Sequence, residues 1–141
     1  MDNSTAAVRA DLEAAGVAVI DCRLRANKCI SLSDGAIVAV DCSKFKTQRE
    51  EATALMHEEG HFKSGAFYVP FSSYQVKAQA EYRADKAAAM KHIPPSELAA
   101  ALRGGLCVWE IAELFNVTPA FVLRAYTIYQ EHMGIDLAAL A

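Results

Sequence analysis

The sequence has no long apolar run: no stretch approaches the roughly 18 consecutive apolar residues of a membrane-spanning helix. Its first residues, Met1 to Ser4, have no basic start, and no apolar segment of the kind found in secretory signals follows them. We therefore expect a cytoplasmic protein without a membrane partner.

The four cysteines are scattered and show no Cys-x-x-Cys spacing. This excludes the usual patterns of a zinc knuckle or a dithiol redox motif, so free thiols are expected. Positive charge is also not in excess, since 14 Lys and Arg stand against 17 Asp and Glu, for a net charge of −3. Such a chain has no overall attraction for nucleic acid or for an anionic membrane. The expected partner is therefore another protein.

The sequence does contain a short motif with metal-binding character, His57-Glu58-Glu59-Gly60-His61. Two histidines four residues apart lie on one face of a helix, so their imidazoles can converge on one ion, with Glu58 beside them. A catalytic zinc site usually has three protein ligands and leaves one position open. Glu81 is the candidate third ligand, because it lies in an alanine-rich segment, Ala78 to Met90, that is predicted to be helical.

The context of the motif favours a metal site over a solvated charged helix. Thr47 to Glu50 has the pattern of a capping box, and the apolar residues Ala52, Leu55 and Met56 follow it at helical spacing. An antiparallel pair of helices would then close a His/His/Glu site. In such a site Glu58 would act as general base. Zinc is the expected metal, although manganese, iron or cobalt would also suit these ligands.

Together these residues resemble the ImmA/IrrE-type metallo-endopeptidases. In that family a His-Glu-x-Gly-His helix is followed by a helix with Glu-x-x-Ala-Asn. The matching positions here are His57, Glu58, Gly60, His61, Glu81, Ala84 and Asp85. The resemblance extends over nearly the whole chain. It implies a zinc-dependent endopeptidase, of the phage or mobile-element anti-repressor type, that cleaves a helix-turn-helix repressor and so relieves transcriptional repression.

Asp85 stands where the family usually has Asn. A carboxylate there could accept a hydrogen bond from His57 and fix its tautomer, or it could compete with Glu81 for the metal. Three tyrosines are candidates for stabilising the transition state, and the sequence does not choose among Tyr68, Tyr74 and Tyr82. The first two lie in an aromatic loop, Phe62 to Gln75, whose phenylalanines, Phe67 and Phe71 among them, are expected to fill the core below the site.

The first half of the chain predicts an α+β fold. Ser4 can cap a helix that runs to about Ala15 and ends at Gly16. Three strands are expected after it, with a hairpin turn at Asp34-Gly35 between the second and third. Their ranges are Val17 to Asp21, Lys28 to Leu32 and Ile37 to Val40. We expect a small, mainly antiparallel three-stranded sheet packed on a zincin-like helical core, with Ile37 to Val40 as the edge strand that pairs with substrate.

The remainder of the chain reads as a helical module. Helices are expected over Glu97 to Leu102, Val108 to Phe115, and from Thr118 to about His132, the last two in a helix-turn-helix-like order. From Ile93 onward there are two arginines against five acidic residues, which disfavours DNA binding. We therefore predict two domains, a metallopeptidase domain at 1–92 and a helical module at 93–141 packed on it.

Trp109 and two histidines have a predicted degree of burial. Trp109 is expected in the core, and His92 and His132 on the surface.

An alternative to the peptidase is a metal-stabilised, non-proteolytic module that binds and sequesters a repressor. Glu58 argues against that alternative, because a purely structural site needs no base beside an open coordination position.

Overall fold

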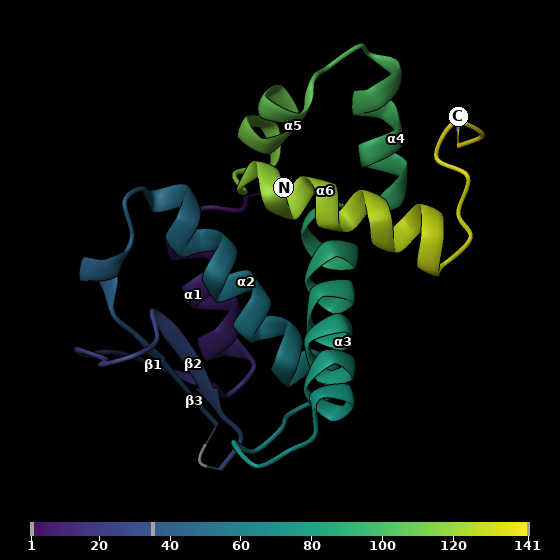
Figure 1. Ribbon diagram of the computed structural model, residues 1–141. Helices are drawn as coiled ribbons and strands as arrows, with labels where there is room; N and C mark the ends of the chain where they lie inside the picture. The colour runs from purple at the N-terminus through teal and green to yellow at the C-terminus, as the bar shows by residue number, and fades with distance from the viewer. Residues whose placement is uncertain (1, 35, 141) are drawn as a thin grey trace.

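The computed structural model describes residues 2–34 and 36–140. Within those residues the fold is α+β, with six α-helices and a three-stranded mixed sheet. Figure 1 shows the sheet, α1 and α2 on one side of the molecule, α3 alongside them, and α4 to α6 gathered around the far end of α3. No helix in this described part combines the length and the apolar character needed to cross a bilayer.

Helix α1 (Thr5–Ala14) begins at the predicted cap, because the Ser4 side chain accepts a hydrogen bond from the Ala7 backbone N–H at 3.2 Å. Gly16, with φ of +85°, ends it in the left-handed region. Val8 and Leu12 form its buried face. The helix leads directly into strand β1 (Ala18–Asp21).

The sheet has the order β1-β3-β2, so two expectations about it are wrong. Strand β3 (Ile37–Val40) pairs in parallel with β1 and antiparallel with β2 (Cys29–Leu32), which makes the sheet mixed rather than mainly antiparallel. It is also the central strand, not the edge. Its last three residues are all buried, as is typical of a strand covered on both faces. The predicted turn at Asp34-Gly35 involves Gly35, which lies outside the described residues.

Helices α2 (Gln48–Ser64) and α3 (Tyr74–His92) pack against each other and carry the metal-binding motif. Thr47 caps α2 as predicted, whereas the Glu50 carboxylate accepts from Lys46 N–H, so the capping box is only half formed. Gly60 explains how closely the helices approach: a Cβ there would lie 2.1 Å from the Ala84 carbonyl oxygen. Only glycine fits this crossing.

The second half is helical, with bounds close to those expected from the sequence. It comprises α4 (Pro95–Arg103), α5 (Val108–Phe115), α6 (Pro119–Thr127) and a π-helical turn, Ile128–His132. Trp109 is 69% exposed, so its expected place in the core is wrong: the buried face of α5 is formed by Ile111, Ala112 and Phe115. Most of the buried apolar side chains form one cluster that runs from Val8 on α1 to Leu137, beyond the π-helical turn. The boundary between 1–92 and 93–141 stays a prediction.

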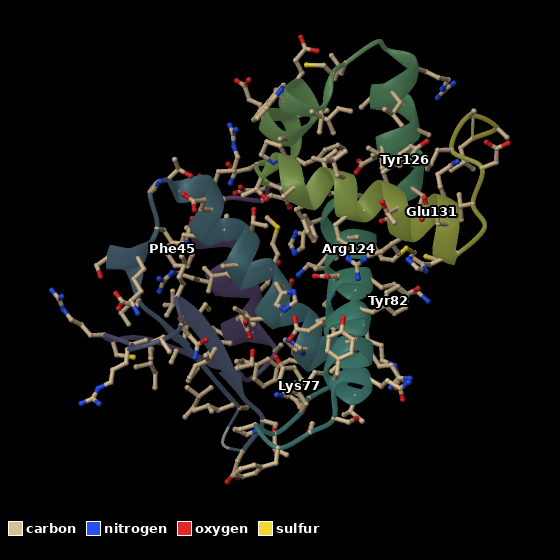
Figure 2. The ribbon with its side chains drawn as sticks, in the orientation of Figure 1. Phe45, Lys77, Tyr82, Arg124, Tyr126 and Glu131 are labelled. Atoms are coloured by element: carbon tan, nitrogen blue, oxygen red, sulfur yellow. The ribbon has the colours of Figure 1, made fainter. Side chains whose placement is uncertain are left out.

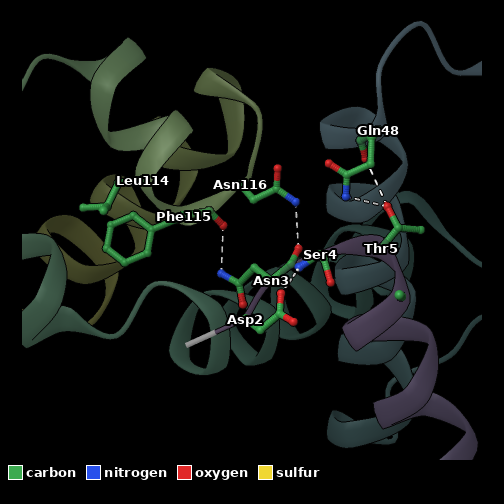
Figure 3. A pocket seen from close by; sticks show the side chains of 9 residues that line it. Asp2, Asn3, Ser4, Thr5, Gln48, Leu114, Phe115 and Asn116 are labelled. Carbon is green, nitrogen blue, oxygen red and sulfur yellow. Dashed lines mark hydrogen bonds between the residues drawn. The ribbon is translucent and has the colours of Figure 1, made fainter.

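His92 is buried, which corrects the expectation of a surface residue, while His132 is exposed as expected. The His92 ring lies between Glu59 Oε1 at Nε2 and Asn3 Oδ1 at Nδ1, each at 2.8 Å. The Asn3 amide also donates to the backbone oxygens of His92 and Phe115. Asn116 in turn donates to the Asn3 backbone oxygen, and Figure 3 shows this bond and the bond from Asn3 to Phe115 at the edge of a pocket. Asn3 therefore joins α3 to α5 and, through His92, to Glu59 on α2.

Candidate metal centre

The three residues predicted as metal ligands lie together at the crossing of α2 and α3. His57 and His61 come from α2 and Glu81 from α3, and their ligand atoms all lie within 4.8 Å of one another. His57 Nε2 is 2.6 Å from one oxygen of Glu81, and His61 Nε2 is 3.4 Å from the other. Two nitrogens and a carboxylate oxygen converging in this way could hold a divalent metal ion.

Hydrogen bonds on the far side of each imidazole fix the nitrogen that faces the centre. His61 Nδ1 lies 2.6 Å from the Ala66 carbonyl oxygen, and His57 Nδ1 lies 2.7 Å from Asp85 Oδ1. A carbonyl oxygen only accepts, so the His61 Nδ1 must carry the proton. Nε2 of both rings therefore faces the centre, where each can bind a metal ion once it carries no proton.

The charged groups of the centre shift one another's pKa values. Burial opposes protonation of His57, but its bonds to Asp85 and Glu81 outweigh burial and raise its pKa from 6.5 to about 10. The two histidines hold the pKa of Glu81 far below its usual range. The carboxylates thus favour positive charge at the centre, and a divalent cation bound there would replace the proton on His57.

Glu58 lies beside the centre, buried, with a pKa raised by burial. Its Oε2 accepts a hydrogen bond from the hydroxyl of Ser31 on β2. Sequence reasoning did not identify Ser31, although its signal was a single polar residue within an apolar strand. The hydroxyl holds the carboxylate in one orientation next to the metal-binding residues.

The centre forms the floor of a cleft of about 500 Å³. One wall is β2, so the strand beside the centre is the edge strand β2 and not β3. The loop between α2 and α3 also lines it, through Phe67, Tyr68 and Pro70. The cleft is lined by Asn27, Cys29, Ile30, Ser31, Leu32, His57, Glu58, His61, Phe67, Tyr68, Pro70 and Glu81.

The structure separates the three candidate tyrosines. Tyr68 lines the cleft, and the neighbouring Glu81 raises its pKa to about 12, so it remains a protonated donor. Tyr74 is 85% exposed at the start of α3. Tyr82 lies away from the cleft, with its ring 5.3 Å from that of His132. Only Tyr68 of these three is placed to reach a group bound at the centre.

The aromatic loop is less buried than expected. Phe71 is 96% exposed, so it does not fill the core. Phe67 is half-buried and stacks on His61, with ring centroids 5.8 Å apart. Pro70 lines the cleft, whereas the exposed Phe71 and Tyr74 do not.

Asp85 lies on the outer side of His57, and both of its oxygens are engaged. Oδ1 bonds to His57 Nδ1, and Oδ2 accepts from Arg124 Nε at 3.0 Å. This position favours the supporting role over competition with Glu81, because the carboxylate faces the nitrogen that points away from the centre. Sequence reasoning missed Arg124: it lies 39 residues further along the chain, and no motif marks it.

Comparisons of this chain with protein-family models, curated proteins and solved structures find no match to it. The interpretation of the centre therefore rests on its own geometry and on the motif. That geometry comprises three convergent ligand atoms, a buried carboxylate beside them, and an open cleft next to an edge strand.

Proposed function

We propose that this protein is a zinc-dependent endopeptidase of the ImmA/IrrE type. The observation that carries the proposal is the position of Glu58: a buried carboxylate, oriented by Ser31, beside a convergent His57/His61/Glu81 set at the floor of an open cleft. A centre that serves only to stabilise a fold has four protein ligands and no such base. The proposal includes a zincin-like arrangement of α2 and α3.

A divalent metal held by these ligands would supply Lewis acidity toward a carbonyl oxygen and a water molecule. Glu58 then acts as general base: it takes a proton from the attacking water and delivers it to the leaving amine. Its raised pKa brings it closer to neutral pH, where a group can both accept and return a proton. Tyr68 donates a hydrogen bond to the developing oxyanion from the wall of the cleft.

The edge of the sheet suggests how a peptide binds. Strand β2 pairs with β3 on one side only, so within the described residues its other edge has no partner strand. An extended substrate segment can add to such an edge through backbone hydrogen bonds. Because Ser31 and Leu32 of β2 line the cleft, a peptide paired there passes directly over the centre.

The substrate we propose is a helix-turn-helix repressor, whose cleavage in the cytoplasm relieves transcriptional repression. The family resemblance of the two motifs supports this, and the net charge of −3 suits a protein partner better than nucleic acid. Helices α5 and α6, joined by a turn at Asn116, are themselves helix-turn-helix-like. We assign them a packing role and not DNA binding, given their acidic surroundings.

The test compares the wild type with Glu58→Gln. Bound metal is quantified in both proteins, and each is incubated with the repressor encoded nearest in the genome. We expect equal metal content and cleavage by the wild type alone, with a loss of at least about 100-fold in rate for the variant. Full activity of Glu58→Gln would remove the mechanism. Metal in both proteins with cleavage by neither would favour a module that sequesters the repressor.

A further inference from the structure

A chain of two hydrogen bonds connects the metal centre to the C-terminal helices. His57 on α2 bonds to one oxygen of Asp85 on α3, and Arg124 on α6 donates to the other, with distances of 2.7 and 3.0 Å. The guanidinium also lies over the ring of Tyr82, 5.9 Å from its centroid, and Figure 2 shows Arg124 reaching from α6 toward Tyr82 on α3. Three helices thus meet at the Asp85 carboxylate.

Asp85 depends on such a partner to hold its position. Its side chain is 19% exposed, so the carboxylate has lost most of its hydration, and a charged donor compensates for that loss. A carboxylate bonded at both oxygens has one orientation, whereas a carboxylate bonded only to His57 can rotate. The orientation of Asp85 fixes the plane of the His57 ring, which in turn directs Nε2 at the metal.

We propose that Arg124 is a positioning residue of the metal centre, through which helix α6 sets the metal affinity of a site formed by α2 and α3. The inference rests on the metal-binding part of the proposed function and not on peptide cleavage. It also gives a reason for the departure from the family pattern at position 85: aspartate, unlike the usual asparagine, pairs with an arginine.

Electrostatics alone predicts the opposite effect. Arg124 is a positive charge close to a bound cation, so its removal should strengthen metal binding if simple repulsion dominates. Loss of orientation should weaken binding, since supporting groups of metal ligands are typically worth about 10- to 100-fold in affinity. We expect orientation to dominate, because Asp85 lies between Arg124 and His57 and neutralises the guanidinium. Whether removal of Arg124 weakens or strengthens metal binding therefore decides between orientation and repulsion.

The experiment measures zinc affinity by competition with a chromogenic chelator at fixed pH and ionic strength. Arg124→Met keeps the apolar stem and removes the charge, and we expect its affinity to fall about tenfold. Arg103→Met, an exposed arginine at the end of α4, is the matched control and should leave the affinity unchanged. If circular dichroism shows that Arg124→Met does not fold, Arg124→Lys takes its place. We expect a smaller fall in zinc affinity for this variant.

The Asp85→Asn background completes the test. If Arg124 acts through the Asp85 carboxylate, Arg124→Met should have little further effect once that carboxylate is gone. Unchanged or tighter zinc binding by Arg124→Met in the wild-type background would overturn the proposal, and so would an equal loss in both backgrounds. Zinc binding by the wild type without any peptide cleavage would refute only the proposed activity. No zinc binding by the wild type would refute both.

Discussion

At the scale of single residues, His57 is held between two carboxylates. Its two ring nitrogens face Asp85 and Glu81, and these bonds outweigh burial to raise its pKa to about 10. The charged ring bonds to both carboxylates, so His57 stabilises the folded state only while it is protonated.

We therefore predict a specific pH dependence for the chelator-treated protein. The stabilisation from His57 should be fully present below the unfolded pKa of about 6.5 and should decline as pH rises toward 10, because the folded pKa is the higher one. The measurement is urea denaturation of the metal-free wild type and His57→Gln at pH 6, 8 and 10. The difference between the two proteins isolates this residue, and a difference that grows with pH would contradict the prediction.

The residues of the centre illustrate what a sequence can reveal. The spacing of His57 and His61 follows from helix geometry, and Glu81 falls on a second segment with clear helical character, so local rules predicted which residues meet. Ser31 and Arg124 were not predicted, because each reaches the centre from an element that is distant in the chain. Such contacts depend on how helices and strands pack together, and local sequence patterns do not predict that packing.

At the scale of elements, the helix pair α2 and α3 depends on Gly60. An alanine Cβ at this position would lie 2.1 Å from the backbone oxygen of Ala84, and backbone cannot move aside as a flexible side chain can. The helices would have to separate, which moves Glu81 away from the histidines on α2.

For Gly60→Ala we predict a loss of about 2–3 kcal/mol in the free energy of unfolding, as found for overpacked interiors, together with weaker metal binding. Urea denaturation and the chelator assay measure the two effects. Gly104→Ala is the control, since Gly104 has a helical φ of −70° and its nearest neighbours to a Cβ lie 3.4 Å or more away. A stability of Gly60→Ala equal to that of the control would refute the close approach.

The strands show where prediction from sequence stops. All three were located within one residue of their observed ends, because apolar, β-branched runs between turn residues are a local signal. The order of the strands in the sheet was not predicted, since pairing is decided by contacts between distant residues. Val38, Ala39 and Val40 did carry a hint, because an unbroken apolar run is typical of a strand buried on both faces. That hint favours β3 as the centre and β2 as the edge beside the cleft.

At the scale of the whole molecule, the buried polar network around His92 joins the N-terminal segment to both halves of the chain. The Asn3 amide N–H₂ donates to two carbonyl oxygens, which fixes its oxygen toward His92 Nδ1. Glu59 completes the network, held by His92 and by Lys91 at 2.6 Å. Burial raises the pKa of Glu59, but these two partners outweigh it and lower the pKa below its usual value.

Asn3→Ala should therefore destabilise the whole fold by about 1–3 kcal/mol, because it leaves the His92 ring and two carbonyl oxygens without their partner. Thermal unfolding should remain a single transition at a lower temperature. Asp2→Ala is the matched control, since the exposed Asp2 carboxylate bonds only to the Ser4 backbone N–H in the described structure. A melting temperature of Asn3→Ala equal to that of Asp2→Ala would show that the network contributes little.

The strand order also determines when the fold can be completed during synthesis. Strand β1 precedes β2 in the chain, yet its only partner in the described structure is β3, so at least residues up to Val40 must emerge before β1 can pair. The β2–β3 hairpin is local and can form quickly by itself. During synthesis, β1 therefore cannot join the sheet until β3 has emerged, so the α1–β1 segment is secured after the β2–β3 hairpin although it precedes that hairpin in the chain.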